Sequence, residues 1–223
     1  MLRSSHSGPH VPDVIVLATR NRGKIKEIRQ VLQGMPIAVE SLDEYPHVPE
    51  PEETGETFAE NAAQKAMYYA RATGKWCLAD DSGLVVDALG GRPGVHSARY
   101  AAADAPPGSG REVIDAANNA KLLKALDNVA DAQRTARFVC CLALSDGMQV
   151  MLETCDSVEG VIARQPSGQG GFGYDPLFHI PTLGKTTAEL PPEQKNSLSH
   201  RGKALRKFQA MLHEFIASRS TGL

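Results

Sequence analysis

The stretch Val14-Ile-Val-Leu-Ala-Thr-Arg-Asn-Arg-Gly-Lys24-Ile-Lys-Glu-Ile28 passes from a strand pattern to a helix pattern. Its first part, Val14 to Ala18, is a short apolar run of the kind that forms a buried strand. From Lys24 onward, apolar residues recur at helical spacing as far as Leu32. A strand that leads directly into a helix favours a mixed α and β architecture.

Capping signals predict further helices along the chain. Thr57-Phe-Ala-Glu60 has the spacing of a capping box, and Gly74 is suited to end the helix that follows. A second helical stretch is expected from Glu112 to Asp127, and the last helix is expected to start near His200.

Strand patterns lie between these helices. The runs 137–144 and 149–154 flank Asp146-Gly147, a dipeptide typical of a tight hairpin. The runs 76–79 and 84–87 are predicted as two short strands around a turn at Asp80-Asp81-Ser82-Gly83. The mixture predicts an α/β fold built around one elongated sheet.

Size and charge limit the possible functions. The 223 residues fit one domain or two closely packed lobes. We expect residues 1–12, which lack the apolar stretch of a secretory signal, to form a flexible tail, and residues 13–219 to form a single two-lobed domain. The net charge of −2 argues against a nucleic-acid partner, and no apolar run approaches the roughly 18 residues of a membrane span.

The four cysteines carry no metal-binding spacing. They are Cys77, Cys140, Cys141 and Cys155, without a Cys-x-x-Cys pair. We interpret them as buried free thiols in a reducing compartment, which predicts a cytoplasmic protein.

The loop between the first strand and helix has the composition of a phosphate site. A helix N-terminus offers unpaired N–H groups and a partial positive charge. Cationic and short polar side chains stand at the same place, although a simple capped helix with solvated basic residues would have this sequence too. The candidate residues are Thr19, Arg20, Asn21, Arg22, Gly23 and Lys24.

Carboxylates form two groups. Glu50, Glu52, Glu53 and Glu56 crowd one loop, and Asp80 and Asp81 are adjacent. Acids that lie close together repel one another unless a cation lies between them, and Mg²⁺ with bound phosphates suits a small set of oxygen ligands. A solvated acidic loop and an ordinary turn are the alternatives.

Two further segments carry candidate binding residues. In Gly168-Gln-Gly-Gly-Phe-Gly-Tyr-Asp-Pro176, the glycines allow close approach to a flat ligand, although a flexible loop would also use them. Phe172 and Tyr174 offer a stacking face, and Asp175 offers an acceptor for a base edge. Farther on, Lys195 suits a phosphate or base carbonyl, and Arg201 suits a purine O6 and N7; helix capping and surface charge are the alternative there.

Six ordered motifs give the chain a resemblance to a known family, the inosine triphosphate pyrophosphatases, which act on non-standard purine nucleotides. Together they span nearly the whole sequence. The motifs are Thr19-x-Asn-x-x-Lys24, Glu52-Glu-Thr-Gly-x-Thr-Phe-x-Glu-Asn61, Ala79-Asp-Asp-Ser-Gly83, Gly90-Gly-x-Pro-Gly-x-x-Ser-Ala-Arg99, Gly171-Phe-Gly-Tyr-Asp-Pro176 and Ser199-His-Arg201.

The resemblance implies Mg²⁺-dependent hydrolysis of ITP, dITP and XTP to the monophosphate and pyrophosphate by a homodimer. It implies an elongated central mixed sheet with flanking helices, and two lobes around a nucleotide-binding cleft. Asp81 would be the catalytic base and, with Glu52, a metal ligand. The residues expected to bind substrate are Thr19 to Lys24, Ser82, Phe172, Gly173, Tyr174, Asp175, Lys195, His200 and Arg201.

Two other functions remain open from the sequence. A nucleotide-binding protein without activity would need the phosphate loop but not the acidic residues. A pyrophosphatase for modified pyrimidine nucleotides would use similar chemistry. For purines, we expect a donor such as Arg201 to face the 6-oxo group and leave adenine unmatched.

Overall fold

The computed structural model describes residues 11–220, so most of the tail predicted for residues 1–12 lies outside the described residues. Within this range the strands form one mixed seven-stranded sheet with the order β2-β1-β3-β4-β5-β6-β7. β1 pairs in parallel with β2 and β3, and all other pairs are antiparallel. The strands are β1 (Val14–Leu17), β2 (Ala38–Ser41), β3 (Trp76–Val86), β4 (Thr135–Ser145), β5 (Val150–Ile162), β6 (Phe178–Ile180) and β7 (Lys185–Thr186).

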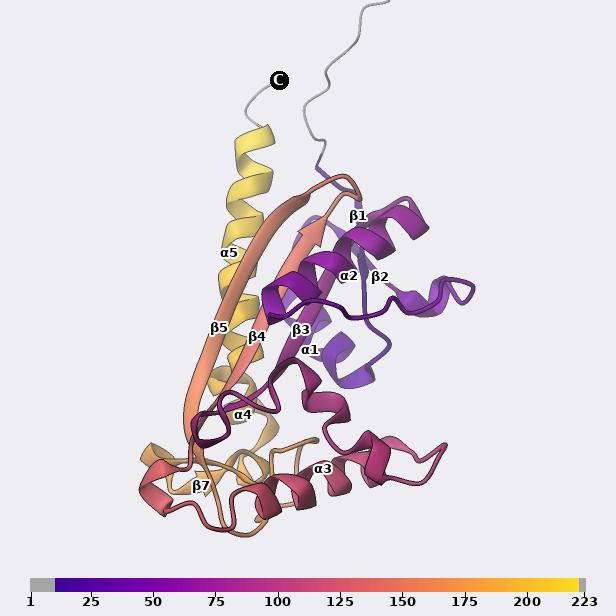
Figure 1. The fold of residues 1–223 in the computed structure, drawn as a ribbon. Coiled ribbons are helices and arrows are strands. Elements are labelled where there is room, and N and C mark those ends of the chain that lie inside the picture. The colour runs from indigo at the N-terminus through magenta and orange to yellow at the C-terminus, as the bar shows by residue number, and fades with distance from the viewer. Residues whose placement is uncertain (1–10, 221–223) are drawn as a thin grey trace, which may run out of the picture.

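Helices cover both faces of the sheet. Figure 1 shows the long β4–β5 pair between α5 and α2, above a smaller lower lobe that contains α3 and β7. The predicted α/β class and the elongated mixed sheet with flanking helices are confirmed. The helices are α1 (Arg22–Leu32), α2 (Phe58–Thr73), α3 (Arg111–Ala125), α4 (Pro192–Leu198) and α5 (His200–Ser220).

Three apolar clusters hold these layers together. The first joins α1 and α5 to one sheet face through residues such as Ile28 and Phe208. The second joins α2 to the opposite face, with Ala62, Ala66 and Tyr69 fully covered. The third lies under α3 in the lower lobe. Because side chains alternate along a strand, β3 contributes to both faces of the sheet at once.

The capping prediction for α2 is confirmed in detail. The Thr57 hydroxyl accepts from the backbone of Glu60, and the Glu60 carboxylate accepts from the backbone of Thr57. Gly74 ends the helix in the left-handed conformation, with φ of 68°. The start of α2 is therefore fixed, together with the acidic loop in front of it.

The predicted turn at Asp80 to Gly83 is wrong. β3 is continuous from Trp76 to Val86, and residues 77–86 pair with β4 without interruption. Asp, Ser and Gly disfavour strands on average, but pairing along the whole length of β4 outweighs that preference. The acidic motif therefore lies in the middle of the sheet.

The interpretation of the cysteines as free thiols is correct for Cys77 and Cys140, which are buried, and wrong for the other two. Cys141 of β4 and Cys155 of β5 form a disulfide. They are directly opposite in the antiparallel register, which places their Cβ atoms on the same face and close together. Within the described residues, no helix is long and apolar enough to cross a membrane.

Candidate active site

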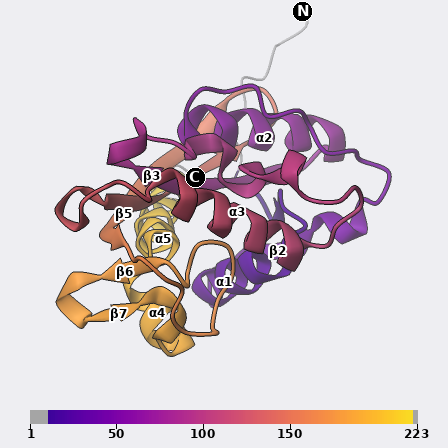
Figure 2. The same ribbon diagram turned by 60° about the horizontal axis from the view of Figure 1, so that its bottom comes forward.

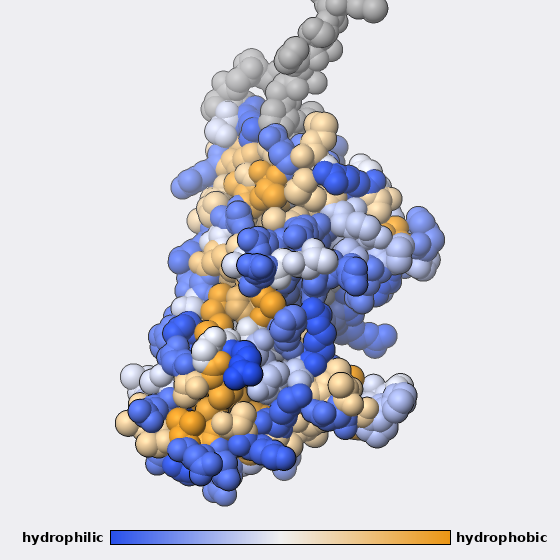
Figure 3. All heavy atoms as spheres, viewed as in Figure 1, coloured by the Kyte–Doolittle hydropathy of each residue, from blue (hydrophilic) through white to orange (hydrophobic). Residues whose placement is uncertain are grey.

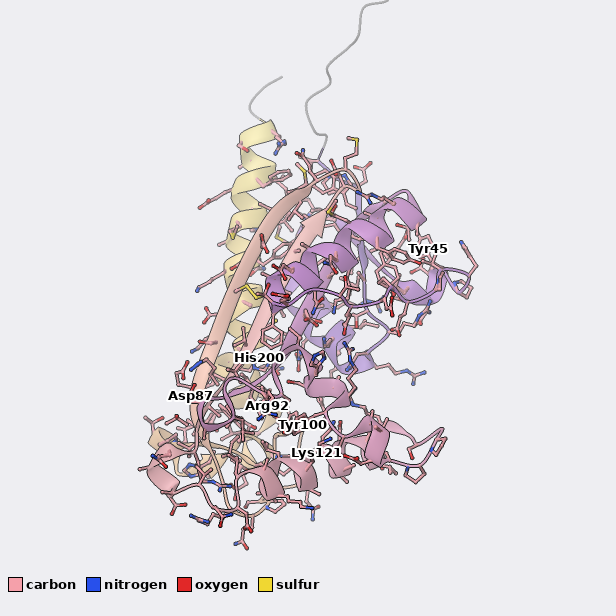
Figure 4. All side chains as sticks on the ribbon, in the orientation of Figure 1. Tyr45, Asp87, Arg92, Tyr100, Lys121 and His200 are labelled. Carbon is pink, nitrogen blue, oxygen red and sulfur yellow. A yellow bond between two sulfur atoms is a disulfide. The ribbon has the colours of Figure 1, made fainter. Side chains whose placement is uncertain are left out.

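A cleft of about 700 Å³ opens where the sheet meets the lower lobe. Figure 4 labels His200 at this junction and Arg92, Tyr100 and Lys121 in the lower lobe. Arg22, Gly23 and Asp81 are not among the lining residues. The predicted site residues that do line it are Thr19, Arg20, Asn21, Lys24, Glu52, Ser82, Phe172, Gly173, Tyr174, Asp175, Lys195, His200 and Arg201.

The N-terminus of α1 forms one end of the cleft. Asn21 caps the helix, since its Oδ1 accepts from the backbone N–H groups of Gly23 at 2.9 Å and Lys24 at 3.3 Å. The Thr19 hydroxyl accepts from the backbone N–H of Asn21. The helix end keeps its partial positive charge, so this part of the predicted phosphate loop suits an anion.

Two of the predicted phosphate-binding cations are placed differently from Lys24. Arg20 donates to the backbone carbonyls of Leu42 and Val48, and thereby ties down the loop after β2. Arg22 is exposed and lies outside the cleft. Lys24 lines the cleft and contacts the buried Asp80.

Asp80 and Asp81 point to opposite faces of the sheet because they are neighbours in one strand. They therefore do not share a cation in the way that their adjacency in the sequence suggests. Asp80 is completely buried on the α1–α5 face, where Lys24 Nζ lies 2.6 Å from Oδ1 and Arg201 Nε donates to Oδ2 at 3.0 Å. Burial raises the pKa of Asp80, but Lys24 and Arg201 outweigh burial and hold that pKa well below its ordinary value.

Arg201 joins several elements at the bottom of the cleft. Besides Asp80, its Nη2 donates to the hydroxyl of Ser82 at 2.9 Å and its Nη1 donates to Glu27 at 2.9 Å. The residue is 4% exposed. Each of the three guanidinium nitrogens of Arg201 therefore donates to a protein side chain. A contact to purine O6 could use only the N–H groups that do not take part in these bonds.

Asp81 lies on the α2 face beside Lys65. The ammonium of Lys65 donates to Asp81 Oδ1 at 2.9 Å, while Oδ2 is buried and has no hydrogen-bond partner among residues 11–220. Burial raises the pKa of Asp81 above its ordinary value, and Lys65 offsets only part of that effect. One oxygen of this carboxylate is therefore held in place, and the other is available to a proton or a cation.

The acidic loop reaches the same place. Glu53 accepts from Lys65 at 3.0 Å and from Arg99 at 2.7 Å, and Glu52 is exposed at the edge of the cleft. Among residues 11–220, no three His, Cys, Asp or Glu side chains are grouped closely enough to hold a metal ion by themselves. Asp81 Oδ2 and the exposed carboxylate of Glu52, neither of which has a partner in the described part of the chain, suit a hard cation that takes its other ligands from water and phosphate.

The loop before β6 forms the opposite wall. Figure 2 shows it between α3 and the start of α1. Phe172 is 38% exposed, and Lys195 Nζ lies 5.1 Å from the centre of its ring. Asp175 is buried and accepts from the Phe172 N–H, the Lys195 ammonium and the Thr187 hydroxyl, so it shapes the loop rather than facing a ligand freely. Gly171 is required there, because a Cβ would lie 2.1 Å from Asp175 Oδ2.

Two predicted binding residues are mainly buried. Tyr174 is 4% exposed and its hydroxyl donates to the backbone carbonyl of Ser97, so Phe172 is the ring that the loop presents to the cleft. His200 stacks on Phe138 with ring centres 4.9 Å apart. Burial lowers the pKa of His200 well below its ordinary value, which keeps the imidazole neutral.

Sequence reasoning missed Lys65, Glu27 and Arg99 as functional residues. Lys65 could have been recognised, because it lies on the same face of α2 as the buried residues Ala62 and Ala66, where a charged side chain is unusual. Glu27 had none, since its partner Arg201 is 174 residues away in the sequence.

Comparisons with known proteins show the family to which the chain belongs. A sequence profile described as the Ham1 family matches residues 15–211. The chain belongs to the Ham1 family. It is 50% identical to the dITP/XTP pyrophosphatase of Geobacillus kaustophilus over 208 residues, covering 92% of this chain and 97% of that protein. It is 51% identical to the enzyme of the same name from Geobacter sulfurreducens, covering 86% and 92%.

Solved structures of the Ham1 family have the same fold. The HAM1 protein of Coxiella burnetii superposes with a TM-score of 0.80 at 42% identity and covers 90% of this chain and 98% of its own. A nucleoside-triphosphatase / dITP/XTP pyrophosphatase from Mycobacterium abscessus gives 0.70 at 42% identity, covering 89% and 99%. The resemblance inferred from the six motifs is thus confirmed.

Proposed function

We propose that this Ham1 family protein hydrolyses ITP, dITP and XTP to the monophosphate and pyrophosphate. The proposal is supported most directly by Asp81, a buried carboxylate with one anchored and one unpaired oxygen, next to a cleft lined at one end by the start of α1 and at the other by the exposed ring of Phe172. The relatives named dITP/XTP pyrophosphatase support the choice of substrate.

The phosphates would lie at the N-terminus of α1. Thr19, Asn21 and Lys24 line that end of the cleft, and the Lys24 ammonium adds its charge to the positive end of the helix dipole. Lys24 contacts Asp80 in the structure, so its charge is already positioned by a fixed carboxylate. A triphosphate held at both the helix end and the base loop would be aligned for attack at one phosphorus.

Asp81 would accept the proton of the attacking water. Lys65 fixes Oδ1, which leaves Oδ2 as the accepting atom. The metal would be Mg²⁺, held by Asp81 and Glu52, where it would neutralise phosphate charge when bound. Apart from the metal, the contacts in this arrangement are made by residues of the chain. Asp81, which would accept the proton, lies on β3, a rigid central strand of the sheet.

Purine selection would depend on Phe172 and Lys195. The base would stack on the exposed ring of Phe172, and Lys195, anchored by Asp175, would donate to the 6-oxo group. Adenine would place an amine against this ammonium and leave the donor unmatched. Lys195 fits this role better than Arg201, whose guanidinium is bonded to Asp80, Glu27 and Ser82.

A substrate panel tests the proposal. Pyrophosphate and orthophosphate release would be measured with ITP, dITP, XTP, GTP, ATP and UTP, with and without Mg²⁺. We expect Mg²⁺-dependent pyrophosphate from the first three. Nucleotide binding without any release would favour a binding protein, equal turnover of UTP would favour a pyrimidine pyrophosphatase, and orthophosphate as the direct product would refute cleavage between the α and β phosphates.

Replacing Phe172 by alanine is expected to weaken nucleotide binding with little effect on folding. Stacking of a base on an aromatic ring contributes about 1–3 kcal/mol, which corresponds to a roughly 5- to 150-fold higher Kd. Calorimetric titration of the variant with ITP and with pyrophosphate would separate base from phosphate binding. Phe172→Tyr keeps the ring and serves as the control; equal ITP affinity of the alanine variant would contradict the stacking role.

The proposed partners and location follow from the family resemblance. We propose a homodimer, to be measured by light scattering, with a nucleotide as the small-molecule partner and no nucleic acid or membrane. Figure 3 shows several separate apolar patches on one face, each surrounded by hydrophilic residues. We propose a cytoplasmic location because nucleoside triphosphates are made there. The argument from free thiols no longer supports this location, since Cys141 and Cys155 form a disulfide.

A further inference from the structure

One sequence motif, Gly90 to Arg99, is not used by the proposed reaction. Its last part, the short 3₁₀ helix Gly94–Arg99, packs against β3 directly after the acidic residues. The Ser97 hydroxyl accepts from the backbone N–H of Leu84, and a Cβ on Gly83 would lie 2.4 Å from that hydroxyl. The 3₁₀ helix therefore packs tightly against β3, the strand that carries Asp81, and its last residue, Arg99, lines the cleft.

Arg99 begins a chain of alternating charges that leads to Asp81. Its Nη1 donates to Glu53 Oε2 at 2.7 Å; Glu53 Oε1 accepts from Lys65 Nζ at 3.0 Å; and the same ammonium donates to Asp81 Oδ1 at 2.9 Å. The exposed fraction of these side chains falls from 46% at Arg99 through 23% and 14% to 9% at Asp81. The chain thus connects an exposed cation with the buried carboxylate.

Lys65 is shared between two carboxylates, and Arg99 affects how it is shared. With Arg99 present, each oxygen of Glu53 has a cationic partner. Without Arg99, Lys65 would be the remaining cation on Glu53, and the loop segment that carries Glu52 would lose its tether to the 3₁₀ helix. Both changes would loosen the hold of Lys65 on Asp81 Oδ1.

We infer that Arg99 is a positioning residue for the reaction: through Glu53 and Lys65 it fixes the orientation of the Asp81 carboxylate. This inference rests on the proposed function. It assigns a role to Arg99, the last residue of the motif, which is connected to the proton acceptor Asp81 through three successive contacts. Small displacements of a reacting group lower the rate strongly, so the effect belongs to kcat.

The test compares steady-state kinetics of Arg99→Gln and wild type with dITP. We expect kcat to fall about 10- to 100-fold while KM stays within about threefold. Arg99→Lys should recover most of the rate, because a single donor contacts Glu53. Glu53→Gln should lower kcat similarly, and Arg99→Gln combined with Glu53→Gln should be no slower than the slower single variant, since both break the same connection.

Arg164→Gln is the matched control. Arg164 also contacts a carboxylate, Asp131, at 2.7 Å on an exposed surface, and it does not line the cleft. Its kcat should equal that of wild type, and the thermal midpoint of Arg99→Gln should move no more than that of this control. An Arg99→Gln kcat equal to wild type, a change in KM alone, or multiplicative losses in the double variant would overturn the inference and leave the proposed function intact. Absence of pyrophosphate release by wild type would overturn both.

Discussion

Replacement of Asp81 by asparagine is expected to lower kcat for dITP about 10²- to 10⁴-fold, the usual contribution of a general base. Asparagine has the same shape, so its carbonyl oxygen can still accept from Lys65 in place of Oδ1. The other oxygen is replaced by an amide nitrogen, which cannot accept a proton from water. Because the proposed phosphate and base contacts are made by other residues, the Kd for nucleotide measured in the absence of Mg²⁺ should change only a few-fold.

Asp87→Asn is the control for this experiment. Asp87 stands directly after the same strand, is 45% exposed at its side chain, and pairs with Arg137 on the surface. Its substitution should leave kcat unchanged. Wild-type turnover by the Asp81→Asn variant would exclude Asp81 as the base, whereas loss of nucleotide binding in parallel with turnover would make it a binding residue instead.

Elements with strong local signals were predictable from the sequence. The change to helical spacing at Lys24, the capping box at Thr57 and the Asp-Gly hairpin each depend on neighbouring residues, and all three agree with the structure. β3 was divided wrongly because its turn-forming residues lie in a strand that is stabilised by β4, about 60 residues later. Local preference cannot reveal such a distant pairing partner.

Many of the residues that line the candidate cleft could be named from the motifs, but Lys65, Glu27 and the contacts between the cleft residues could not. The motifs identified Asp80, Asp81 and Arg201 separately. Side chains alternate between the two faces of a strand, so Asp80 and Asp81 point to opposite faces of the sheet. This could not be predicted while the two residues were assigned to a turn. The contact between Asp80 and Arg201 joins residues 121 positions apart, and it changes Arg201 from an expected base contact into part of a buried ionic network.

That network leads to a large expected effect on stability. Asp80→Asn keeps the side-chain volume and removes the charge that Lys24 and Arg201 share. Arg201 would remain 4% exposed with Glu27 as its other carboxylate partner. Removing one member of a buried ionic group costs about 3–5 kcal/mol, because the remaining charge stays buried without full compensation. Urea denaturation followed by circular dichroism would measure this loss in the free energy of unfolding.

The pH dependence of this loss separates a charge effect from a packing effect. Because the pKa of Asp80 is lowered in the folded protein, its carboxylate stabilises the fold above the pKa of an unfolded aspartate, about 3.9, and this contribution disappears as the pH falls below it. The stability difference between wild type and Asp80→Asn should therefore be largest near neutral pH and shrink in acid. Asp131→Asn, which breaks an exposed pair with Arg164, should cost less than about 1 kcal/mol at any pH. A difference for Asp80→Asn that stays constant into acid would assign the loss to packing, and a difference as small as that of Asp131→Asn would show that Lys24 and Arg201 do not depend on Asp80.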